Sequence, residues 1–598
     1  MSALLATLHR LPTWLLTLAV VLGVAGARLW LISHYGSDQP FHDQWAAEGF
    51  YRNWFDGNLE WRIFFYPHNE HRPALTRLLA MAGFWVNGQW DCRVQMLVNL
   101  GIYLSAVALL CELARRLLAP RTFLPIAGIA LLLFSQPANF ENALWGFQSQ
   151  FYLLLLLGAA HVLGSCRARM DLPWALAPLA GLLGLFTIAA GALSAAAVWL
   201  LSASDLVRNG KSVRAVATLG INSGLLLLGW WSFPGGVAHS TRAESLSQFL
   251  AAAGHLLAWP AASLWGVVLF VPVGLFAWRI ARAANSTAPQ RGLLACGIWC
   301  VLMIAAFAYG RGTAPGSIAV RYYDVLAVGV FVNAVAMAWL WSEAKNHRPL
   351  YGAALLGWIL IWGAGYVRLN RPAEVGRILG EWRDYFARQQ VVIREFLATD
   401  DEGTLSKDPL VSRFLPHFEL ARDLLRDPRM RARLPPSLVP PLAMRRDAVR
   451  ARGFETLESP GARASASDGL TDQLYASQPL KRAGLAVLRF RVEGSPDDSS
   501  SSLWLERANG ERVHALGGDV ALTPQGRTVN FLVGQGDVRV VARTTAGSGF
   551  AFSAPIEVGI LSWFAPKILS AWPAVLGGAG LCFVLGAVGV LRQPRNGD

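Results

Sequence analysis

The chain has 598 residues, of which 54% are hydrophobic and 15% are charged. This composition excludes an ordinary soluble protein and indicates an integral membrane protein with room for many spans and a soluble domain. The formal net charge of +14 does not indicate nucleic-acid binding, because the basic residues are scattered between apolar runs and form no patch.

The first apolar run extends from residue 11 to residue 32. It is long enough to cross a bilayer, since a membrane helix needs about 20 apolar residues. The small residues Ala25, Gly26 and Ala27 resemble a signal-peptide cleavage site, which is the alternative interpretation. Apolar sequence continues after them as far as Ile32, so we expect a retained membrane anchor.

A polar segment from residue 33 to residue 91 follows this anchor and mixes titratable with aromatic side chains. Its most notable titratable residues are Asp38, His42, Asp43, Glu48, Asp56, His68, Glu70, His71 and Arg72. A plain connection between two membrane helices has no need of so many titratable groups, and aromatic rings suit a bilayer interface or the face of a sugar. We therefore expect a functional site in this segment.

Further apolar runs bring the number of expected membrane spans to about twelve. These runs cover residues 92–118, 122–135, 147–165, 172–189, 190–206, 215–233, 263–280, 292–308, 324–342, 349–367 and 564–591. The pair at 172–206 has an alternative interpretation as a re-entrant hairpin, because residues 191–194 (GALS) make a poor loop.

The basic residues of the loops predict the orientation. With the amino terminus in the cytoplasm, the loops on the cytoplasmic side carry most of the arginines, as the positive-inside rule requires. Arg242, Arg311 and Arg321 are exceptions on the outer side. An arginine on that side needs a partner, and an anionic ligand is a natural one.

The longest polar segment is also expected on the outer side. Residues 368–452 are charged and predicted to be helical, whereas residues 453–563 alternate polar and apolar side chains in the manner of a small β-sandwich. We therefore divide the chain into a transmembrane catalytic module (1–367), these two outer segments, and a last membrane helix with a cytoplasmic tail (564–598).

Several other chemistries are disfavoured. No phosphate-binding loop of the G-x-x-x-x-G-K-S/T type occurs, which argues against a nucleotide-driven pump. The cysteines lie in or beside apolar runs, so neither disulfides nor a cysteine metal site is expected. His68, Glu70 and His71 have the composition of a metal site, but their spacing is not H-E-x-x-H and a third ligand is not obvious, so zinc is not expected.

The layout resembles the GT-C class of polytopic glycosyltransferases, which use polyprenyl-phosphate-linked sugars as donors. In that class, the outer loop after the first membrane helix carries an acidic residue that serves as catalytic base. The matching segment here is PFHDQWAAEGFYRNW, in which Asp43 has the corresponding place. The resemblance implies a GT-C-like fold, no cofactor, and Asp43 as the general base of an inverting transfer. Gln44 stands where many members have a second acidic residue, so a bound divalent metal is not favoured.

Orientation and resemblance together imply an enzyme of the bacterial inner membrane, with both termini cytoplasmic and the large domain periplasmic. Its expected partners are membrane lipid, a polyprenyl-phosphate sugar, and an acceptor outside the cytoplasm. This acceptor is a lipid-linked or other glycan, lipopolysaccharide, a cell-wall polymer or a protein.

The chemistry of the residues agrees with this expectation. Sugar transfer needs a base near the acceptor hydroxyl and fixed cations or donors for the leaving phosphate. The phosphate candidates are Arg72, Arg311, Arg321, His68 and His71. The candidates for contacts with the sugar or the acceptor are His42, Glu48, Glu141, Trp145, Gln148 and Tyr322.

Simpler roles stay open at this stage. Asp43 can cap a helix that begins at Gln44, and Arg321 can pair with Asp324. Asp38 and Glu48 are the next candidates for the base. The alternative functions are a flippase or transporter of lipid-linked glycans and a protein of the O-antigen-polymerase kind. A transporter is expected to show repeated halves, and none are detected in the sequence.

Overall fold

The computed structural model describes most of the chain. It leaves out residues 1, 211, 235–240, 262–263, 284, 314–317, 345–346, 415–417, 448–449, 451–453, 457–460, 465–472, 483, 494–500, 517–526, 545–549 and 594–598.

Ten helical segments among the described residues are long and apolar enough to span a membrane. They lie in α1 (Ser2–Tyr35), α4 (Cys92–Leu117), α7 (Ser149–Ser165), α9 (Leu193–Asn209), α10 (Val213–Ser232), α12 (Val271–Arg282), α13 (Ala288–Gly310), α14 (Tyr323–Glu343), α15 (Arg348–Leu369) and α22 (Trp572–Arg592), some of which are extended by a short 3-10 turn. The prediction of a helical, multi-pass membrane protein is confirmed.

One predicted span is bent. Helix α5 (Pro120–Ser135) reaches a spanning length only together with the 3-10 turn η3 (Pro137–Asn139) and helix α6 (Phe140–Leu144), across a bend of 42°. The bend falls at Gln136, because the residue before a proline is disfavoured in the helical conformation. If this pair is one span, the described spans number up to 11, against the twelve or so expected.

Another predicted span, 172–189, forms the 13-residue helix α8 (Leu172–Gly184). It is followed by the 3-10 turn η5 (Ala189–Ala192) and then by α9. A Cβ atom on Gly191 would lie 1.9 Å from the carbonyl oxygen of Gly184. Only glycine permits this close approach of two backbones, so the small residues that make a poor loop in sequence form a tight hairpin in space.

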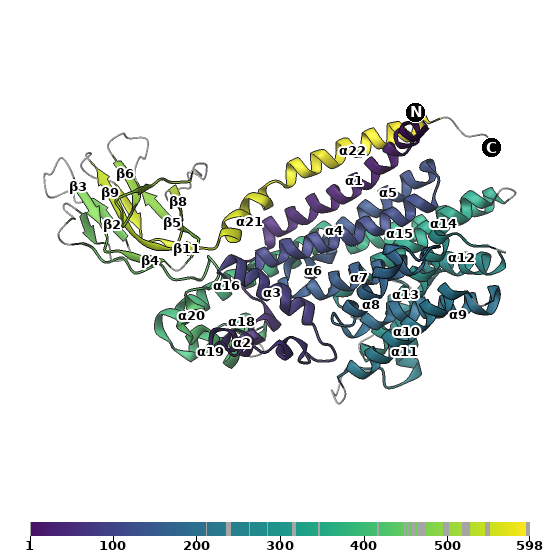
Figure 1. Cartoon of the computed structure of the whole chain (residues 1–598), viewed down its shortest axis with the longest axis horizontal. Helices are drawn as coiled ribbons and strands as arrows, with labels where there is room; N and C mark the ends of the chain where they lie inside the picture. Colours follow the sequence, from purple (N-terminus) through teal and green to yellow (C-terminus); the bar gives the residue numbers. More distant parts are fainter. Residues whose placement is uncertain are drawn as a thin grey trace.

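The first and last membrane helices lie side by side. Helices α1 and α22 run together along one edge of the bundle, so that both ends of the chain lie at one end of the molecule and the strands lie at the other (Figure 1). A Cβ atom on Gly586 would lie 2.9 Å from the carbonyl oxygen of Pro12. Small residues allow this close packing of membrane helices.

A layer of helices and 3-10 turns, up to 28 residues long, lies at the end of the bundle nearest the strands (Figure 1). They are η1 (His42–Ala47), α2 (Glu48–Phe55), η2 (Trp61–Phe65), α3 (Ala74–Asn87), α16 (Pro372–Thr399), α17 (Glu402–Lys407), α18 (Pro409–Phe414), α19 (Phe418–Arg426) and α20 (Pro428–Arg431). Two further short helices, α11 (Leu246–Leu257) and η6 (Leu264–Phe270), precede α12.

Segment 33–91 is fixed on this layer by both apolar and polar contacts. The ring of Phe41 lies 4.7 Å from that of Trp382 on α16. The carboxylate of Asp38 accepts hydrogen bonds from the hydroxyl of Ser437 at 2.6 Å and from the guanidinium of Arg93 at 3.1 Å. A buried carboxylate satisfied in this way is a structural group, and it holds the start of η1 in place.

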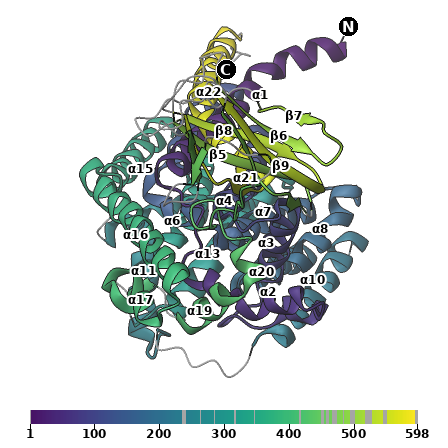
Figure 2. The same ribbon diagram turned by 90° about the vertical axis from the view of Figure 1, so that its left-hand side faces the viewer.

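The described strands form two antiparallel sheets that face each other, and Figure 2 views the molecule from this end. One sheet has the order β1-β2-β10-β5-β11 with β8 paired to β5, and the other has the order β3-β9-β6-β7 with β4 paired to β9. The strands are β1 (Phe454–Thr456), β2 (Gly461–Ala464), β3 (Gln473–Ala476), β4 (Leu480–Arg482), β5 (Ala486–Glu493), β6 (Ser501–Arg507), β7 (Arg512–Val513), β8 (Arg527–Val533), β9 (Gly536–Thr544), β10 (Ala551–Ser553) and β11 (Ile556–Val558). Their apolar side chains, such as Phe490 and Phe531, form a core of their own, as expected of a sandwich.

A polar junction ties the strands back to the bundle. Helix α21 (Ile560–Ser570) follows the last strand, and its first free N–H groups, those of Leu561 and Ser562, donate to Oδ1 of Asn87 at 2.9 and 3.1 Å. The side chain of Gln89 accepts a hydrogen bond from the backbone of Gly559 at 2.9 Å. Asn87 thus caps a helix remote in sequence, as a local N-cap residue would.

Candidate active site

Asp43 lies inside the 3-10 helix η1, which begins one residue earlier at His42. Nδ1 of His42 lies 2.8 Å from Oδ1 of the carboxylate, and Nε2 of His68 lies 3.5 Å from Oδ2. The backbone of His42 is left-handed, with φ at 47°, a conformation that costs energy for a residue with a side chain. The carboxylate therefore faces two imidazoles, and it does not have the position of a cap for a helix starting at Gln44.

These imidazoles determine the charge of Asp43. Burial of the carboxyl would raise its pKa, but the hydrogen bonds with His42 and His68 outweigh burial and hold the pKa well below the usual range of an aspartate. Hydrogen bonds to the charged form of an acid have this effect. Asp43 is consequently an anion at neutral pH, although it is largely shielded from water.

A short turn presents the histidines. The backbones of His68 and His71 exchange hydrogen bonds of 2.8 and 3.2 Å, and Asn69 between them is left-handed with φ at 51°. The buried Nδ1 of His71 has no hydrogen-bond partner among the described residues. Burial lowers the pKa of His71 to about 4, so its ring is neutral at pH 7 and is able to serve as a hydrogen-bond donor or acceptor.

Arg311 is the C-cap residue of α13, where the carbonyl ends of a helix attract a cation. Its guanidinium donates to the hydroxyl of Tyr322 at 3.1 Å and to that of Thr241 at 3.0 Å. The carboxylate of Glu70 is more distant, at 3.8 Å. The neutral hydroxyls do not offset the positive charge of the arginine, and its one ion pair among the described residues is long, so Arg311 suits an anionic ligand.

Arg321, in the 3-10 turn η7 (Val320–Tyr322), has a different partner from the one expected. Its guanidinium donates to Glu141 at 2.9 Å and its backbone N–H donates to the same carboxylate at 3.1 Å. The predicted alternative pairing with Asp324 is wrong, because Asp324 is bound by Arg28 of α1 at 3.1 Å. Asn142 joins the two pairs by donating to Asp324 and to the carbonyl of Arg321.

These groups surround a cavity of about 930 Å³, which we call the arginine cavity. Its titratable lining residues are His42, Asp43, His68, Glu70, His71, Glu141, Arg242, Arg311 and Arg321. Another part of its wall is apolar and comes from the membrane helices and their connections: Ile188, Ala189, Ala190, Leu193, Phe233, Pro234, Ala306 and Phe307. One wall thus suits an anion and the other suits a hydrocarbon chain.

Most of the remaining candidates also line the arginine cavity, among them Trp145, Gln148 and Tyr322. The indole N–H of Trp145 has no hydrogen-bond partner among the described residues, so it is a donor available to a ligand. Trp382 and Tyr309 line the same cavity and were not predicted. Trp382 had a signal, since it lies in an amphipathic stretch, but nothing in the sequence indicates that it lines the same cavity as Asp43.

One candidate, Arg72, does not join this group. Arg72 donates to the backbone carbonyls of Phe65 at 2.7 Å and Ser232 at 2.8 Å, so it connects η2 to the end of α10 and is not among the residues lining the arginine cavity. Glu48 begins α2, but its side chain lies outside the described part of the chain.

The residues fit a metal ion poorly. Both carboxylate oxygens of Asp43 face imidazoles, and no group of three or more His, Cys, Asp or Glu in the described part of the chain is arranged to hold a metal.

Comparisons with known proteins add little to this geometry. No protein-family model and no curated protein matches the chain. Among solved structures, the apo form of the oligosaccharyltransferase of Archaeoglobus fulgidus matches with a TM-score of 0.37 and 10% sequence identity, over 60% of this chain and 56% of that one. The match therefore spans little more than half of that enzyme, and at this TM-score it carries no argument about function.

Proposed function

We propose that this membrane protein is a glycosyltransferase that moves a sugar from a polyprenyl phosphate to an acceptor hydroxyl. One observation supports it above the others: an ionised, shielded carboxylate, Asp43, lines the same cavity as Arg311 and Arg321, and another part of the wall of that cavity is apolar. A polyprenyl-phosphate sugar needs a cation for its phosphate and an apolar surface for its chain. Its transfer also needs a base near the acceptor hydroxyl, so all three features have a use.

In the proposed reaction, the acceptor oxygen attacks the anomeric carbon from the face opposite the phosphate. A new carbon–oxygen bond forms as the bond to the phosphate oxygen breaks, so the configuration at that carbon is inverted. The hydroxyl proton passes to Asp43, whose hydrogen bonds with His42 and His68 keep it in place and spread the charge. A positioned base of this kind contributes roughly 10²–10⁴-fold to the rate.

The polyprenyl phosphate leaves with the electron pair of the broken bond. Arg311 is proposed to receive this charge, because its closest partners among the described residues are two hydroxyls and its ion pair with Glu70 is long, at 3.8 Å. Its guanidinium can donate two parallel hydrogen bonds to phosphate oxygens. His71 offers a neutral ring beside it. Arg321 has a supporting role in this scheme, since Glu141 already neutralises much of its charge.

The orientation belongs to the same proposal. The arginine-rich loops indicate that the two chain ends are cytoplasmic and that the arginine cavity opens on the outer side of a bacterial inner membrane. Donor and acceptor would then both be presented outside the cytoplasm.

Purified protein in detergent, given a panel of radiolabelled polyprenyl-phosphate sugars and candidate acceptors, tests the proposal. We expect polyprenyl phosphate to be released together with a labelled product. Translocation of an intact donor in vesicles, without cleavage, would contradict the proposal and would identify a flippase.

A further inference from the structure

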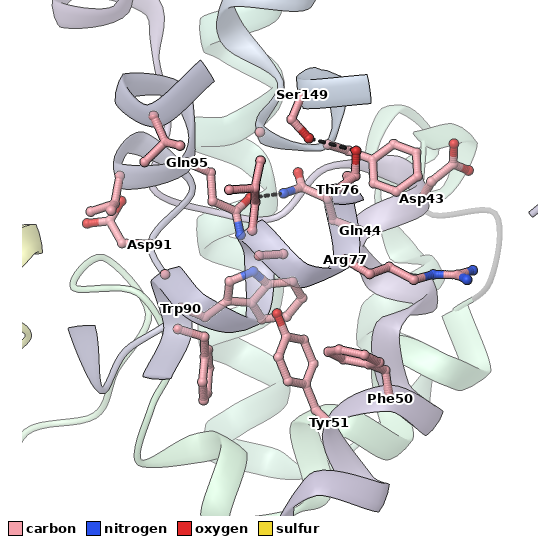
Figure 3. Close-up of a pocket in the computed structure, with 18 of the residues that line it drawn as sticks. Asp43, Gln44, Phe50, Tyr51, Thr76, Arg77, Trp90, Asp91, Gln95 and Ser149 are labelled. Carbon is pink, nitrogen blue, oxygen red and sulfur yellow. Dashed lines mark hydrogen bonds between the residues drawn. The ribbon is translucent and has the colours of Figure 1, made fainter. Parts of the chain in front are cut away.

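Asp43 lines a second cavity as well, together with His68 and Phe147. This cavity, which we call the Trp90 cavity, has a volume of about 420 Å³ and lies between η1, α3 and α4. In Figure 3, Asp43 is at one edge of the cavity and Asp91 is at the opposite edge, with Trp90 and Tyr51 between them. Asp43, the base of the proposed reaction, therefore lines both the arginine cavity and the Trp90 cavity.

The two spaces differ in charge. Among the described residues, the charged side chains that line the Trp90 cavity are Asp43, Asp91 and Arg77, and Arg77 already donates to the carbonyls of Phe64 and Tyr66. The arginine cavity has three arginines, Arg242, Arg311 and Arg321, beside three carboxylates, Asp43, Glu70 and Glu141. A phosphate ligand thus belongs in the arginine cavity, and a neutral ligand belongs in the Trp90 cavity.

The remaining polar lining consists of amides and hydroxyls. Gln44 donates to Gln95 at 2.7 Å and Ser149 donates to Thr76 at 2.8 Å, as drawn in Figure 3. The amide of Gln44 is also bonded to Phe41 and Cys92, whereas the amide nitrogen of Gln95 and the hydroxyls retain hydrogen-bonding capacity at the cavity wall. These groups suit a ligand with several hydroxyl groups.

Trp90 supplies an independent indication of a ligand. Its side chain is 1% exposed, and its indole N–H has no hydrogen-bond partner among the described residues. A buried donor without an acceptor is unfavourable, and a ligand oxygen would satisfy it. The ring lies beside that of Tyr51 at 5.2 Å, and aromatic rings combined with a few polar groups are typical of sites that orient a small polar ligand.

We infer that the Trp90 cavity binds the acceptor and that this acceptor is a neutral saccharide. This inference rests on the proposed function. The acceptor hydroxyl reaches Asp43 from the Trp90 cavity while the donor phosphate lies in the arginine cavity. This arrangement supplies the opposite faces that an inverting attack requires.

Three glycines allow a matched test. A Cβ atom on Gly83, Gly101 or Gly310 meets no other atom within 4 Å. Gly83 lines the Trp90 cavity, Gly310 lines the arginine cavity, and Gly101 lines neither. Leucine is a better helix former than glycine, so Gly83→Leu and Gly101→Leu, both inside helices, should fold. Of these two variants, only Gly83→Leu places its side chain at a cavity.

The assay uses a detergent without a sugar headgroup and a labelled polyprenyl-phosphate sugar that the unmodified protein accepts. The acceptors are methyl glycosides, octyl glycosides, a methyl glucuronide and a short peptide containing Ser, Thr and Asn. We expect Gly83→Leu to raise the acceptor KM at least about tenfold and to leave the donor KM unchanged. Gly310→Leu should do the reverse, and Gly101→Leu should change neither.

The acceptor panel tests the chemical class. Neutral glycosides should be used in preference to the glucuronide and the peptide, and the comparison of methyl with octyl glycosides distinguishes a free from a lipid-linked saccharide. Transfer to the peptide, or an unchanged acceptor KM in Gly83→Leu, would overturn this inference while leaving the proposed function intact. An unmodified protein that cleaves no donor would instead overturn the proposed function.

Discussion

Nε2 of His68 lies 3.5 Å from Oδ2 of Asp43, and both residues line both cavities. This pair is therefore the place where a donor in one cavity and an acceptor in the other would come within reach of a single base. The hydrogen bonds that hold Asp43 ionised come from the two imidazoles beside it, so the same contacts orient the base and set its charge.

The first prediction concerns Arg311. Arg311→Ala should raise the donor KM by roughly 10–100-fold, because a hydrogen bond to a charged group contributes about 1.5–3 kcal/mol. Arg311→Lys should recover only part of the loss, since an ammonium lacks the guanidinium fork. Arg377→Ala is the control, because Arg377 pairs with Glu381 on an exposed face of α16. Equal donor KM values in all of these variants would remove Arg311 from the phosphate site.

The second prediction concerns the buried pair of Arg28 and Asp324, whose side chains are 1% and 0% exposed. Asp324→Asn should destabilise the protein by about 3–5 kcal/mol, because it leaves the Arg28 charge buried without its counter-ion. The double variant Arg28→Met with Asp324→Leu should recover only part of the loss, because Tyr103, Asn139 and Asn142 also donate to Asp324 and lose their acceptor. Thermal unfolding in detergent measures both, and a single variant as stable as the unmodified protein would contradict the structural role.

The third prediction concerns pH. Burial lowers the pKa of His71 to about 4, against about 6.5 for a free histidine. Between these values the folded protein binds fewer protons than the unfolded chain, so the stability due to neutral His71 is present above about pH 6.5 and is lost as the pH falls toward 4. His71→Gln should therefore show a smaller drop in melting temperature between pH 7 and pH 5. An unchanged drop would show that His71 is not held neutral.

The fourth prediction is that sugar transfer does not depend on a divalent metal. The carboxylate of Asp43 is engaged by imidazoles, so we expect EDTA to leave the rate unchanged. Loss of activity in EDTA that Mg²⁺ or Mn²⁺ restores would contradict this expectation and would require a metal ligand beyond those described.

Much of the architecture follows from the sequence. Hydrophobic length predicts the spans, and alternation predicts the strands of the sandwich. The positive-inside rule also set Arg311 and Arg321 apart from the other loop arginines, and both line the cavity that contains Asp43. The expected position of these residues on the outer side was therefore enough to group them before the fold was known.

The pairings within the site could not be predicted in the same way. Arg321 is close to Asp324 in sequence, yet its partner Glu141 is 180 positions away, and the partner of Asp324 is 296 positions away. Such contacts depend on how helices pack, which loop charge does not reveal. Arg72 likewise follows His71 directly in sequence. Its guanidinium, however, donates to the carbonyl of Ser232 at the end of α10, so it does not line the arginine cavity.

The Trp90 cavity had no sequence signal that stood out. Its lining amides, hydroxyls and aromatic rings come from several short elements, and each of these residue types is common in a membrane-interface loop. Only the folded chain brings them together beside Asp43.

The central claim is that Asp43 is the base of sugar transfer. Its most direct test measures the release of labelled polyprenyl phosphate from a donor that the unmodified protein accepts. The variant is Asp43→Asn, and the control is Glu60→Gln, a change at an exposed carboxylate of the same segment. We expect Asp43→Asn to express and bind donor but to lose roughly 10²–10⁴-fold in rate, with Glu60→Gln unaffected. Transfer by Asp43→Asn at the unmodified rate would contradict the account.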